Sequence, residues 1–457
     1  MRNTGSVDHH SLTSLAGRFA GDLLGPGDEG YETARRVHNG LVDKRPALIA
    51  RCRTTADVVA AISLARESGL EISVRGGGHN VSGKAVSEGG VMIDLSLMKV
   101  ITVDPVARTV RAEPGVTWHE LNDATAEQGL ATTGGIVSTT GIAGLTLGGG
   151  LGWLMGKHGL AADNLISVEV VTARGDVLTA SEQEHPDLFW ALRGGGGNFG
   201  IATSFEYRLH PLRQVFGGLV AHSLADGAEA LRFYREFIGT APGELAVMGL
   251  LVHTPDGAPI TAFAICHAGD PALAEVDLKP FLEFGSPVMA NVGPMPYPAV
   301  NSMLDESFPA GVLNYWKSSF LRELSDEAID ALLERFSSVP SPMTGIAIEH
   351  LHGAVTRIGV SDTAVPHREP GFNVLIASEW TDPKATETNI AWTRESYAAL
   401  EPFLSARRYM NYLDHDDGSA VRSAYGPNYE RLAELKRIYD PDNIFHLNLN
   451  IVPATLP

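Results

Sequence analysis

Three glycine-rich blocks in the first half of the chain constrain its fold more than any other feature. They cover residues 74–83, 134–159 and 194–200, and the chain holds 49 glycines in 457 residues. A backbone without Cβ atoms can press close to a ligand and point its N–H groups at it. The blocks therefore predict tight loops that surround a ligand rather than low-complexity linkers.

The first block reads VRGGGHNVSG and follows a short apolar strand expected at residues 71–74. Its three glycines, Gly76 to Gly78, run directly into His79, which places an imidazole at the edge of whatever the loop binds. A flexible turn with an exposed histidine is the simpler explanation of such a motif when it stands alone. The two further glycine blocks favour a ligand-binding loop.

The second block contains GIAGLTLGGGLGWLMGKHG, with seven glycines from Gly141 to Gly156. A block that is both apolar and rich in glycine suits a buried backbone around an apolar ligand with a few polar edges. A glycine-mediated contact between helices explains part of this block but not all of its glycines.

The third block formally matches the dinucleotide-binding pattern GxGxxG at Gly195, Gly197 and Gly200. That pattern requires a strand before it and a helix after it. Here an amphipathic helix is expected at residues 187–193 and a strand at residues 201–209. We therefore reject a Rossmann site at this position.

The expected fold class is α+β with more than one core, because 457 residues exceed one ordinary domain. Capping boxes at residues 54–57 and 117–120 predict the starts of two helices. In the second half, long strands are expected at residues 245–253, 259–267, 312–320, 346–355 and 372–380, and helices at residues 225–238, 272–284, 326–337 and 384–400. This alternation indicates an antiparallel sheet with helices on one face, which leaves the other face free to cover a ligand.

Composition and charge exclude several classes of partner. The net charge of −19 comes from 54 acidic and 35 basic residues, and no Lys/Arg run is present that would follow nucleic-acid phosphates. The first residues lack a signal-peptide pattern, and no stretch of about 18 apolar residues is available to span a bilayer. We expect a cytoplasmic protein that binds neither nucleic acid nor membrane. Cys52 and Cys266 suit a reduced compartment, although their spacing does not exclude a disulfide.

Several motifs in register resemble one flavoprotein family. RGGGH, then GIAGLTLGGGLGWL with HGLAADNL, then LFWALRGGGGNFGI are similar to the FAD-binding (PCMH-type) domain of the vanillyl-alcohol-oxidase superfamily. The tail, NYLDHDDG followed by YGPNYERLAELKRIYDPDNIFHLNLNI, resembles the C-terminal signature of its berberine-bridge-enzyme-like branch. The resemblance extends over residues 31–455.

This resemblance implies three regions. An FAD-binding domain of two α/β subdomains is expected at residues 31–212, and an inserted substrate-binding domain of antiparallel sheet backed by helices at residues 213–400. A berberine-bridge-like segment at residues 401–457 then returns to the FAD domain. The resemblance leaves the oligomeric state and the substrate open.

The cofactor implied by the resemblance is FAD, with its pyrophosphate on the backbone of residues 75–80 and its 8α-methyl bonded to His79. A neutral imidazole is nucleophilic, which suits this linkage. Relatives with a second, cysteinyl link carry a cysteine where this chain has Val137, so a single link is expected. Thr140 aligns beside flavin C4a, where a compact side chain permits access of oxygen. The residues that the resemblance assigns to FAD are Arg75, Gly76, Gly77, Gly78, His79, Asn80, Gly83, Val137, Thr140, Gly141, Gly144, Gly148, Gly150, Asp163, Asn164, Gly200, Ile201, Asn448 and Asn450.

The resemblance also implies the reaction, in which a C–H bond beside an oxygen or nitrogen gives hydride to flavin N5 and a base takes the O–H or N–H proton. Tyr412 aligns with a tyrosine that often lines the reacting face, and Tyr409 is the alternative. A phenol with a pKa near 10 needs a nearby cation to act as a base, and Lys317 is the candidate. A packed aromatic with a satisfied hydroxyl is the competing explanation of Tyr412.

Strand alternation places His350 and His352 on one face of a strand and Glu349 on the other. Two histidines at this spacing can bind a metal, but no convincing third ligand accompanies them, so no metal site is expected.

Three functions follow from these observations. The leading hypothesis is an FAD-dependent oxidase that acts on a small alcohol, amine or carbohydrate-like molecule and reduces molecular oxygen to hydrogen peroxide. The alternatives are a dehydrogenase with another electron acceptor and a binding module that retains the flavin fold without turnover. The intact His79 and all three glycine blocks disfavour the binding module.

Overall fold

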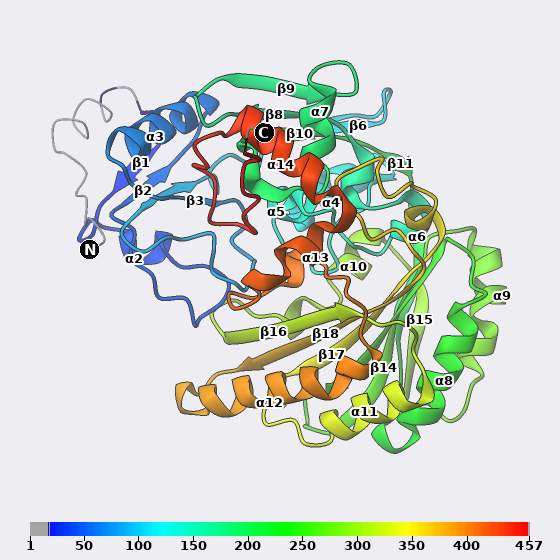
Figure 1. Cartoon of the computed structure of the whole chain (residues 1–457). Coiled ribbons are helices and arrows are strands. Elements are labelled where there is room, and N and C mark those ends of the chain that lie inside the picture. Colours follow the sequence, from blue (N-terminus) through cyan, green and yellow to red (C-terminus); the bar gives the residue numbers. More distant parts are fainter. Residues whose placement is uncertain (1–16, 18, 456–457) are drawn as a thin grey trace.

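The computed structural model describes residue 17 and residues 19–455. Figure 1 shows two layered regions, with the N-terminal strands above and a large sheet with its helices below. The C-terminal helix α14 (Tyr429–Tyr439) lies with the upper region. No helix within residues 19–455 is long and apolar enough to cross a membrane.

The first sheet delivers the first glycine block. It has four strands in the order β1 (Asp22–Leu24), β2 (Leu48–Arg51), β4 (Val91–Asp94) and β3 (Ile72–Arg75). Strands β2, β4 and β3 are parallel, and β1 pairs antiparallel to β2, so the sheet begins before the expected residue 31. Helix α3 (Thr55–Glu67) starts at the predicted capping box, in which Thr54 accepts a hydrogen bond from the Asp57 N–H.

The second sheet carries the other two glycine blocks at its margins. It is antiparallel, in the order β5 (Ile101–Asp104), β6 (Thr109–Ala112), β10 (Ile201–Arg208), β8 (Leu165–Val171) and β9 (Val177–Ser181). The third glycine block lies between helix α7 (Pro186–Leu192) and strand β10. A helix before the block and a strand after it confirm that GxGxxG is not a Rossmann fingerprint here.

The third sheet is the expected antiparallel sheet of the second half, with seven strands. Their order is β15 (Met289–Met295), β12 (Val215–Ser223), β14 (Pro259–His267), β13 (Leu245–His253), β17 (Gly345–Leu351), β18 (Gly371–Trp380) and β16 (Leu313–Phe320). Strands β12 and β15 were not expected, because β12 carries two glycines and β15, MANVGPM, is a largely exposed edge strand with Gly and Pro. Both features weaken the usual strand pattern.

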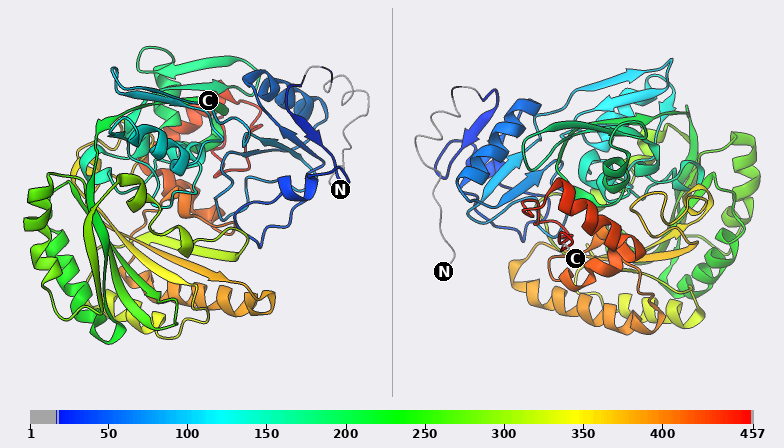
Figure 2. Two further views of the ribbon diagram at one scale, coloured as in Figure 1. Left: turned by 180° about the vertical axis from the view of Figure 1, so that it is seen from behind. Right: turned by 45° about the horizontal axis from the view of Figure 1, so that its top comes forward.

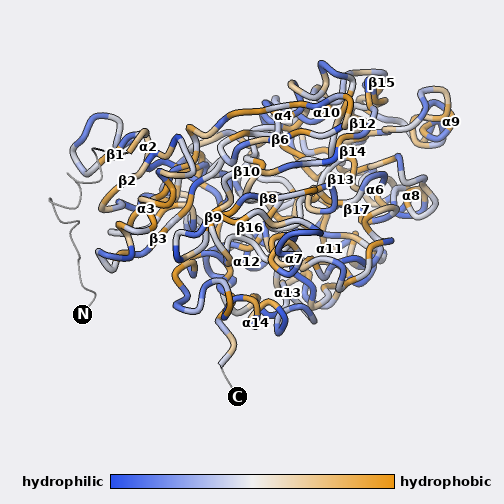
Figure 3. Tube along the Cα trace, turned by 90° about the horizontal axis from the view of Figure 1, so that it is seen from above, coloured by the Kyte–Doolittle hydropathy of each residue, from blue (hydrophilic) through white to orange (hydrophobic). Residues whose placement is uncertain are grey.

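Helices cover one face of this third sheet, as Figures 1 and 2 show. They are α8 (Gly227–Ile238), α9 (Pro271–Leu282), α11 (Asp326–Phe336) and α12 (Thr386–Leu400). The buried Ile346 and Ile348 of β17 share a core with Leu231 of α8 and Ile329 of α11. On α9, apolar and hydrophilic segments alternate in Figure 3, as expected for a helix that buries one side.

The opposite face of the sheet is turned toward the glycine blocks. Because side chains alternate along a strand, Ala347 and Glu349 of β17 point away from the helices, and both line a cavity. The C-terminal segment joins the core of the upper region, where Leu432 and Ile451 pack with Phe205 of β10. The cavity therefore lies where the two regions and the C-terminal segment meet.

Candidate active site

All three glycine blocks, the free face of the third sheet and the C-terminal segment line one cavity. The expected site residues that line it are Gly76, Gly77, Gly78, His79, Asn80, Val137, Thr140, Gly141, Gly144, Gly200, Ile201, Tyr409, Tyr412 and Asn448. Residues from positions as distant as 74 and 449 thus form one site.

The glycines of this cavity have two distinct roles. A Cβ atom on Gly77 would lie 2.6 Å from the backbone of Gly141, and one on Gly141 would lie 2.5 Å from the Gly77 nitrogen. Only glycines at both positions allow the first and second blocks to touch. A Cβ atom on Gly144 would meet nothing within 4 Å, so this face of helix α5 (Ile142–Leu147) adjoins open space inside the cavity. The cavity accordingly has room for a ligand against bare backbone.

His79 lies on the cavity lining and is stacked on His38, with ring centroids 4.0 Å apart and an interplanar angle of 20°. Burial lowers the pKa of His79 to about 3 and that of His38 to about 4. The His79 Nε2 atom is buried and has no hydrogen-bond partner in the part of the chain that the structure describes. A neutral imidazole with a free nitrogen, beside room for a ligand, fits the expected attachment of a flavin.

Seven of the expected cofactor residues lie outside the lining, among them Arg75, Gly83, Gly148 and Gly150. The Arg75 side chain donates to the Ala34 carbonyl at 2.7 Å. Gly83 accepts from Lys44 through its carbonyl at 2.8 Å. A Cβ on Gly148 would strike the Asn411 side chain, and Gly150 donates to the Tyr409 hydroxyl at 3.2 Å. These residues pack the walls of the cavity from behind.

Asp163 and Asn164 lie outside the lining, and their side chains contact other parts of the protein. Asp163 accepts two hydrogen bonds from Arg368, at 2.7 and 2.8 Å, and both side chains are buried. Asn164 donates to the Leu160 carbonyl at 2.8 Å and bonds His210 at 2.7 Å. A buried carboxylate needs a cation, and here Arg368 supplies it, so both residues fix the end of the second block.

Near the C-terminus, Asn448 lines the cavity, whereas Asn450 lies outside its lining. The organising residue here is Asn198 of the third block, which the sequence analysis did not select. Its amide donates to the carbonyls of Gly195 and Leu449 at 2.8 and 3.1 Å, and its oxygen accepts from the Ile451 N–H at 3.1 Å. Asn198 therefore holds the C-terminal segment against the third block.

A buried carboxyl group faces the cavity from the third sheet. The Tyr412 hydroxyl donates to Glu349 Oε1 at 2.8 Å, and the Asn373 amide donates to Oε2 at 2.7 Å. Glu349 is only 3% exposed, and burial raises its pKa to about 7. Burial and the neighbouring Glu349 raise the pKa of Tyr412 well above its usual value of 10.0.

These shifts favour Glu349 over the expected Tyr412 as a proton acceptor. A phenol whose pKa is raised keeps its proton, whereas a carboxyl group with a pKa of about 7 can accept one near neutral pH. Glu349 is therefore better suited than Tyr412 to accept a proton, and Tyr412 donates a hydrogen bond to it. Strand alternation had predicted that Glu349 lies on the face opposite His350 and His352, but no sequence motif indicated a role for it.

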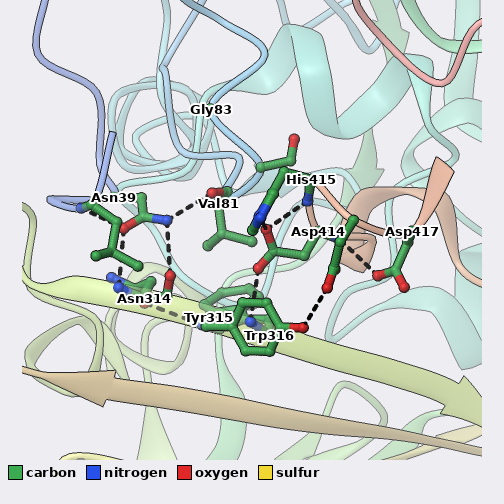
Figure 4. Close-up of polar contacts among 12 residues, drawn as sticks. Asn39, Val81, Gly83, Asn314, Tyr315, Trp316, Asp414, His415 and Asp417 are labelled. Carbon is green, nitrogen blue, oxygen red and sulfur yellow. Dashed lines mark hydrogen bonds and ion pairs between the residues drawn. The ribbon is translucent and has the colours of Figure 1, made fainter. Parts of the chain in front are cut away.

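Lys317 does not supply the positive charge that was expected beside Tyr412. Its ammonium lies 2.7 Å from Asp416 Oδ1 and 2.6 Å from Asp417 Oδ1, and these carboxylates raise its pKa. The alternation of β16 explains this, because the adjacent Trp316 lines the cavity and Lys317 points to the opposite face. Figure 4 shows Asp414 and Asp417 beside this strand.

Tyr409 is fixed to the second glycine block. Its hydroxyl accepts hydrogen bonds from the Gly150 and Leu151 N–H groups, at 3.2 and 3.1 Å, and from the Asn411 amide at 2.9 Å. Burial raises the pKa of Tyr409 to about 12. These contacts make Tyr409 a positioning residue for the cavity wall.

His350 and His352 stack on each other, with centroids 4.9 Å apart, and neither lines the cavity. The described part of the chain contains no group of three or more side chains suited to hold a metal ion.

Family sequence models match two parts of the chain, the FAD binding domain at residues 46–181 and the "Berberine and berberine like" region at residues 408–452. An FAD-linked oxidoreductase of Dictyostelium discoideum is 30% identical over 96% of this chain and 97% of its own length. The (R)-6-hydroxynicotine oxidase of Paenarthrobacter nicotinovorans is 33% identical over 95% of this chain and 97% of its own.

Solved structures show the same fold. The crystal structure of 6-hydroxy-D-nicotine oxidase from Arthrobacter nicotinovorans matches with a TM-score of 0.89 and 31% identity, over 95% of this chain and 98% of that chain. A chitooligosaccharide oxidase matches with a TM-score of 0.87 over 97% of this chain and 100% of its own, and its 22% identity supports likeness of fold alone.

Proposed function

Because this chain belongs to the FAD-linked oxidoreductases that combine an FAD-binding domain with a berberine-like C-terminal region, we propose that it is an oxidase of a small alcohol or amine. In this proposal the substrate gives up hydride from the carbon beside its oxygen or nitrogen, and molecular oxygen is reduced to hydrogen peroxide. The observation that carries the proposal is the buried Glu349–Tyr412 pair, which faces the glycine-lined cavity from the third sheet.

The cavity fits FAD, which would supply the hydride acceptor. The backbone of residues 76–80 would hold its pyrophosphate, and open space beside Gly144 would receive part of the cofactor. His79 would form the single covalent link through its neutral imidazole. Val137 also lines the cavity and has no thiol, so no cysteinyl link is expected.

In the proposed reaction, Glu349 takes the proton from the substrate N–H or O–H group. Tyr412 and Asn373 donate to its two oxygens and so hold the carboxylate in one orientation. General base catalysis of this kind contributes about 10²–10⁴-fold to a rate. A binding module without turnover has no use for a base held in this way.

The mass and visible spectrum of the acid-denatured protein test the cofactor, with His79→Ala as the comparison. We expect one FAD to remain on the wild-type polypeptide and to be released from the variant. Flavin that separates from the denatured wild-type protein would remove the covalent role of His79.

Oxygen reactivity tests the second half of the proposal. Chemically reduced enzyme is exposed to air, and peroxide is measured as the flavin reoxidises. Rapid formation of peroxide is expected, because Thr140, the residue expected beside the flavin, is compact. Slow reoxidation in air but fast reoxidation by an artificial acceptor would identify a dehydrogenase instead.

A further inference from the structure

The wall of the cavity that belongs to the third sheet is apolar. Leu250 of β13 pairs with Ala347 of β17, and Ala347 pairs with Leu375 of β18, so these three side chains form a row across the sheet. All three line the cavity, as do Met248 and Trp316 on the same sheet. We call these five residues the apolar wall. Because Leu250, Ala347 and Leu375 are direct neighbours on adjacent strands, the apolar surface is continuous.

A short segment after helix α10 (Tyr297–Asn301) extends this surface. Leu304 and Phe308 both line the cavity, and the Phe308 ring meets Trp316 edge-on with centroids 5.8 Å apart. The adjacent Asp305 points elsewhere, because both of its oxygens accept from Ser138. The extension therefore adds aromatic and aliphatic surface without a free polar group.

The polar side chains near the wall are already engaged with one another. Asn373 donates to Glu349, and the hydroxyl proton of Tyr412 is donated to Glu349 as well. A carbohydrate has several hydroxyl groups, each of which costs free energy when it is buried without a partner. Among the described residues of the third sheet that line the cavity, Glu349 is the one with a carboxyl or hydroxyl group, and Trp316 already donates its indole N–H to Asn314, so a sugar ring on this side meets few polar partners.

Glu349 also lacks a positive partner. Its two hydrogen-bond donors are a phenol and an amide, both neutral, and no Lys or Arg of the described residues pairs with it. Lys84, the basic residue on the cavity lining, lies near Asp414 and Asp417, whose charges support its own. A buried carboxylate is stabilised by a cation at hydrogen-bond distance, so a cationic ligand would provide the positive charge that Glu349 lacks among the described residues.

We propose that the substrate is a compact apolar amine, whose ring packs on the apolar wall and whose nitrogen binds Glu349, rather than an alcohol or a carbohydrate. This inference rests on the proposed oxidase function. The amine binds as an ammonium ion, passes one N–H proton to the Glu349 carboxylate and loses hydride from the adjacent carbon to FAD. The product is an iminium ion, and molecular oxygen receives the two electrons.

Calorimetric titration of the oxidised holoenzyme tests the preference with three probes: N-methylbenzylamine, benzyl alcohol and cellobiose. N-methylbenzylamine has an apolar ring and a cationic nitrogen, benzyl alcohol retains the ring without the charge, and cellobiose has neither. We expect the amine to bind at least about tenfold more tightly than the alcohol, and cellobiose to bind most weakly. Equal or tighter binding of the alcohol or of cellobiose overturns the proposal, as does failure of the amine to bind.

Two variants separate the charge from the apolar wall. Glu349→Gln should weaken amine binding at least about tenfold and should weaken alcohol binding clearly less than that. Leu375→Asn should lower kcat/KM for the amine by roughly 10–200-fold, whereas the matched Leu375→Met variant, which keeps an apolar side chain, should stay within a few fold. Full flavin content and an unchanged Tm must accompany the Leu375 variants.

These outcomes are distinct from failure of the proposed function. If reduced enzyme forms peroxide in air but its flavin is reduced by cellobiose and not by the amine, the substrate class is wrong and the oxidase proposal stands. If the amine binds through Glu349 but reduced enzyme forms no peroxide, the oxidase proposal fails while the binding preference holds.

Discussion

At the level of single residues, the proposed proton transfer depends on the burial of Glu349 and Tyr412 away from water. Either group alone would have an ordinary pKa on a surface, and burial against an apolar sheet moves both upward. The acidic group of the pair is thereby brought to a pKa of about 7, and the phenol is kept protonated. One carboxyl group can then serve as both anion and proton acceptor near neutral pH.

The first prediction concerns pH. Glu349 must be ionised to accept a proton, so kcat/KM should fall as the pH drops below about 7. The Glu349→Gln variant should lose about 10²–10⁴-fold in kcat/KM. Its kcat/KM should also no longer fall on the acidic side of pH 7, the part of the profile that we call the acidic limb. The measurement is flavin reduction across pH 5–9. A variant that retains both the rate and the limb would show that another group takes the proton.

Tyr412→Phe provides the second prediction. The hydrogen bond from Tyr412 lowers the pKa of Glu349 against the larger effect of burial, so its removal should raise that pKa further. The acidic limb of kcat/KM should therefore move to higher pH, and the plateau rate should survive. The control is Tyr409→Phe, since Tyr409 contacts the Gly150 and Leu151 N–H groups and not Glu349. If Tyr412 were itself the base, the plateau would be lost instead.

Among the elements, the glycine blocks show what a sequence pattern can and cannot reveal. The glycines predict a close approach of backbone, but Gly141 and Gly144 look alike in GIAGL. In the structure, the first touches another loop and the second faces open space. The distinction depends on a contact between residues 77 and 141, which no local pattern specifies.

The third prediction uses this pair of glycines. Gly141→Ala should force the first and second blocks apart and cost roughly 1–3 kcal/mol of stability, because its Cβ would lie 2.5 Å from the Gly77 nitrogen. Gly144→Ala should fold with an unchanged or higher Tm, since alanine favours the helix, but should hold less FAD. Thermal denaturation and flavin content measure the two effects. Full flavin content in Gly144→Ala would place the cofactor elsewhere in the cavity.

Other elements were predicted well wherever the pattern was local. The capping box of α3 and the long strands β13, β14 and β18 follow from spacing alone. Strands β12 and β15 were missed because glycine and proline interrupt them, and their place is set by pairing with β14 and with each other. The ion pair of Asp163 was not predicted for a related reason, since its partner Arg368 lies 205 residues away.

In the molecule as a whole, strand β16 is bonded to two distant parts of the chain, the N-terminal region and the C-terminal segment. Asn39 donates to the carbonyls of Val81 and Asn314, at 2.7 and 3.0 Å, and so links the N-terminal region to β16 (Figure 4). The Trp316 N–H donates to Asp414 at 2.9 Å, which links β16 to the C-terminal segment. The same strand positions Trp316 on the cavity wall. Docking of the regions and formation of the site are therefore coupled.

Lys317 lies within this junction, and the fourth prediction is that its role there is structural. Lys317→Met would leave Asp416 and Asp417 without their shared cation, which should cost roughly 2–4 kcal/mol of stability at neutral pH. The matched control is Lys279→Met, because Lys279 forms an exposed pair with Glu283 at 3.8 Å and should contribute less than about 0.5 kcal/mol.

The pH dependence of this effect has a definite sign. Lys317 and its other neighbours lower the pKa of Asp416 below its ordinary value of 3.8, so the stabilisation is present above that value and is lost as the pH falls through the lowered pKa. The difference in Tm between wild type and Lys317→Met should therefore be largest near neutral pH and shrink in acid, while the acidic limb of kcat/KM near pH 7 stays in place. If Lys317→Met instead had a normal Tm and a displaced acidic limb, Lys317 would have the catalytic role that the sequence suggested. The reason is that only a charge close to the base can shift the titration of the base without affecting the stability of the junction.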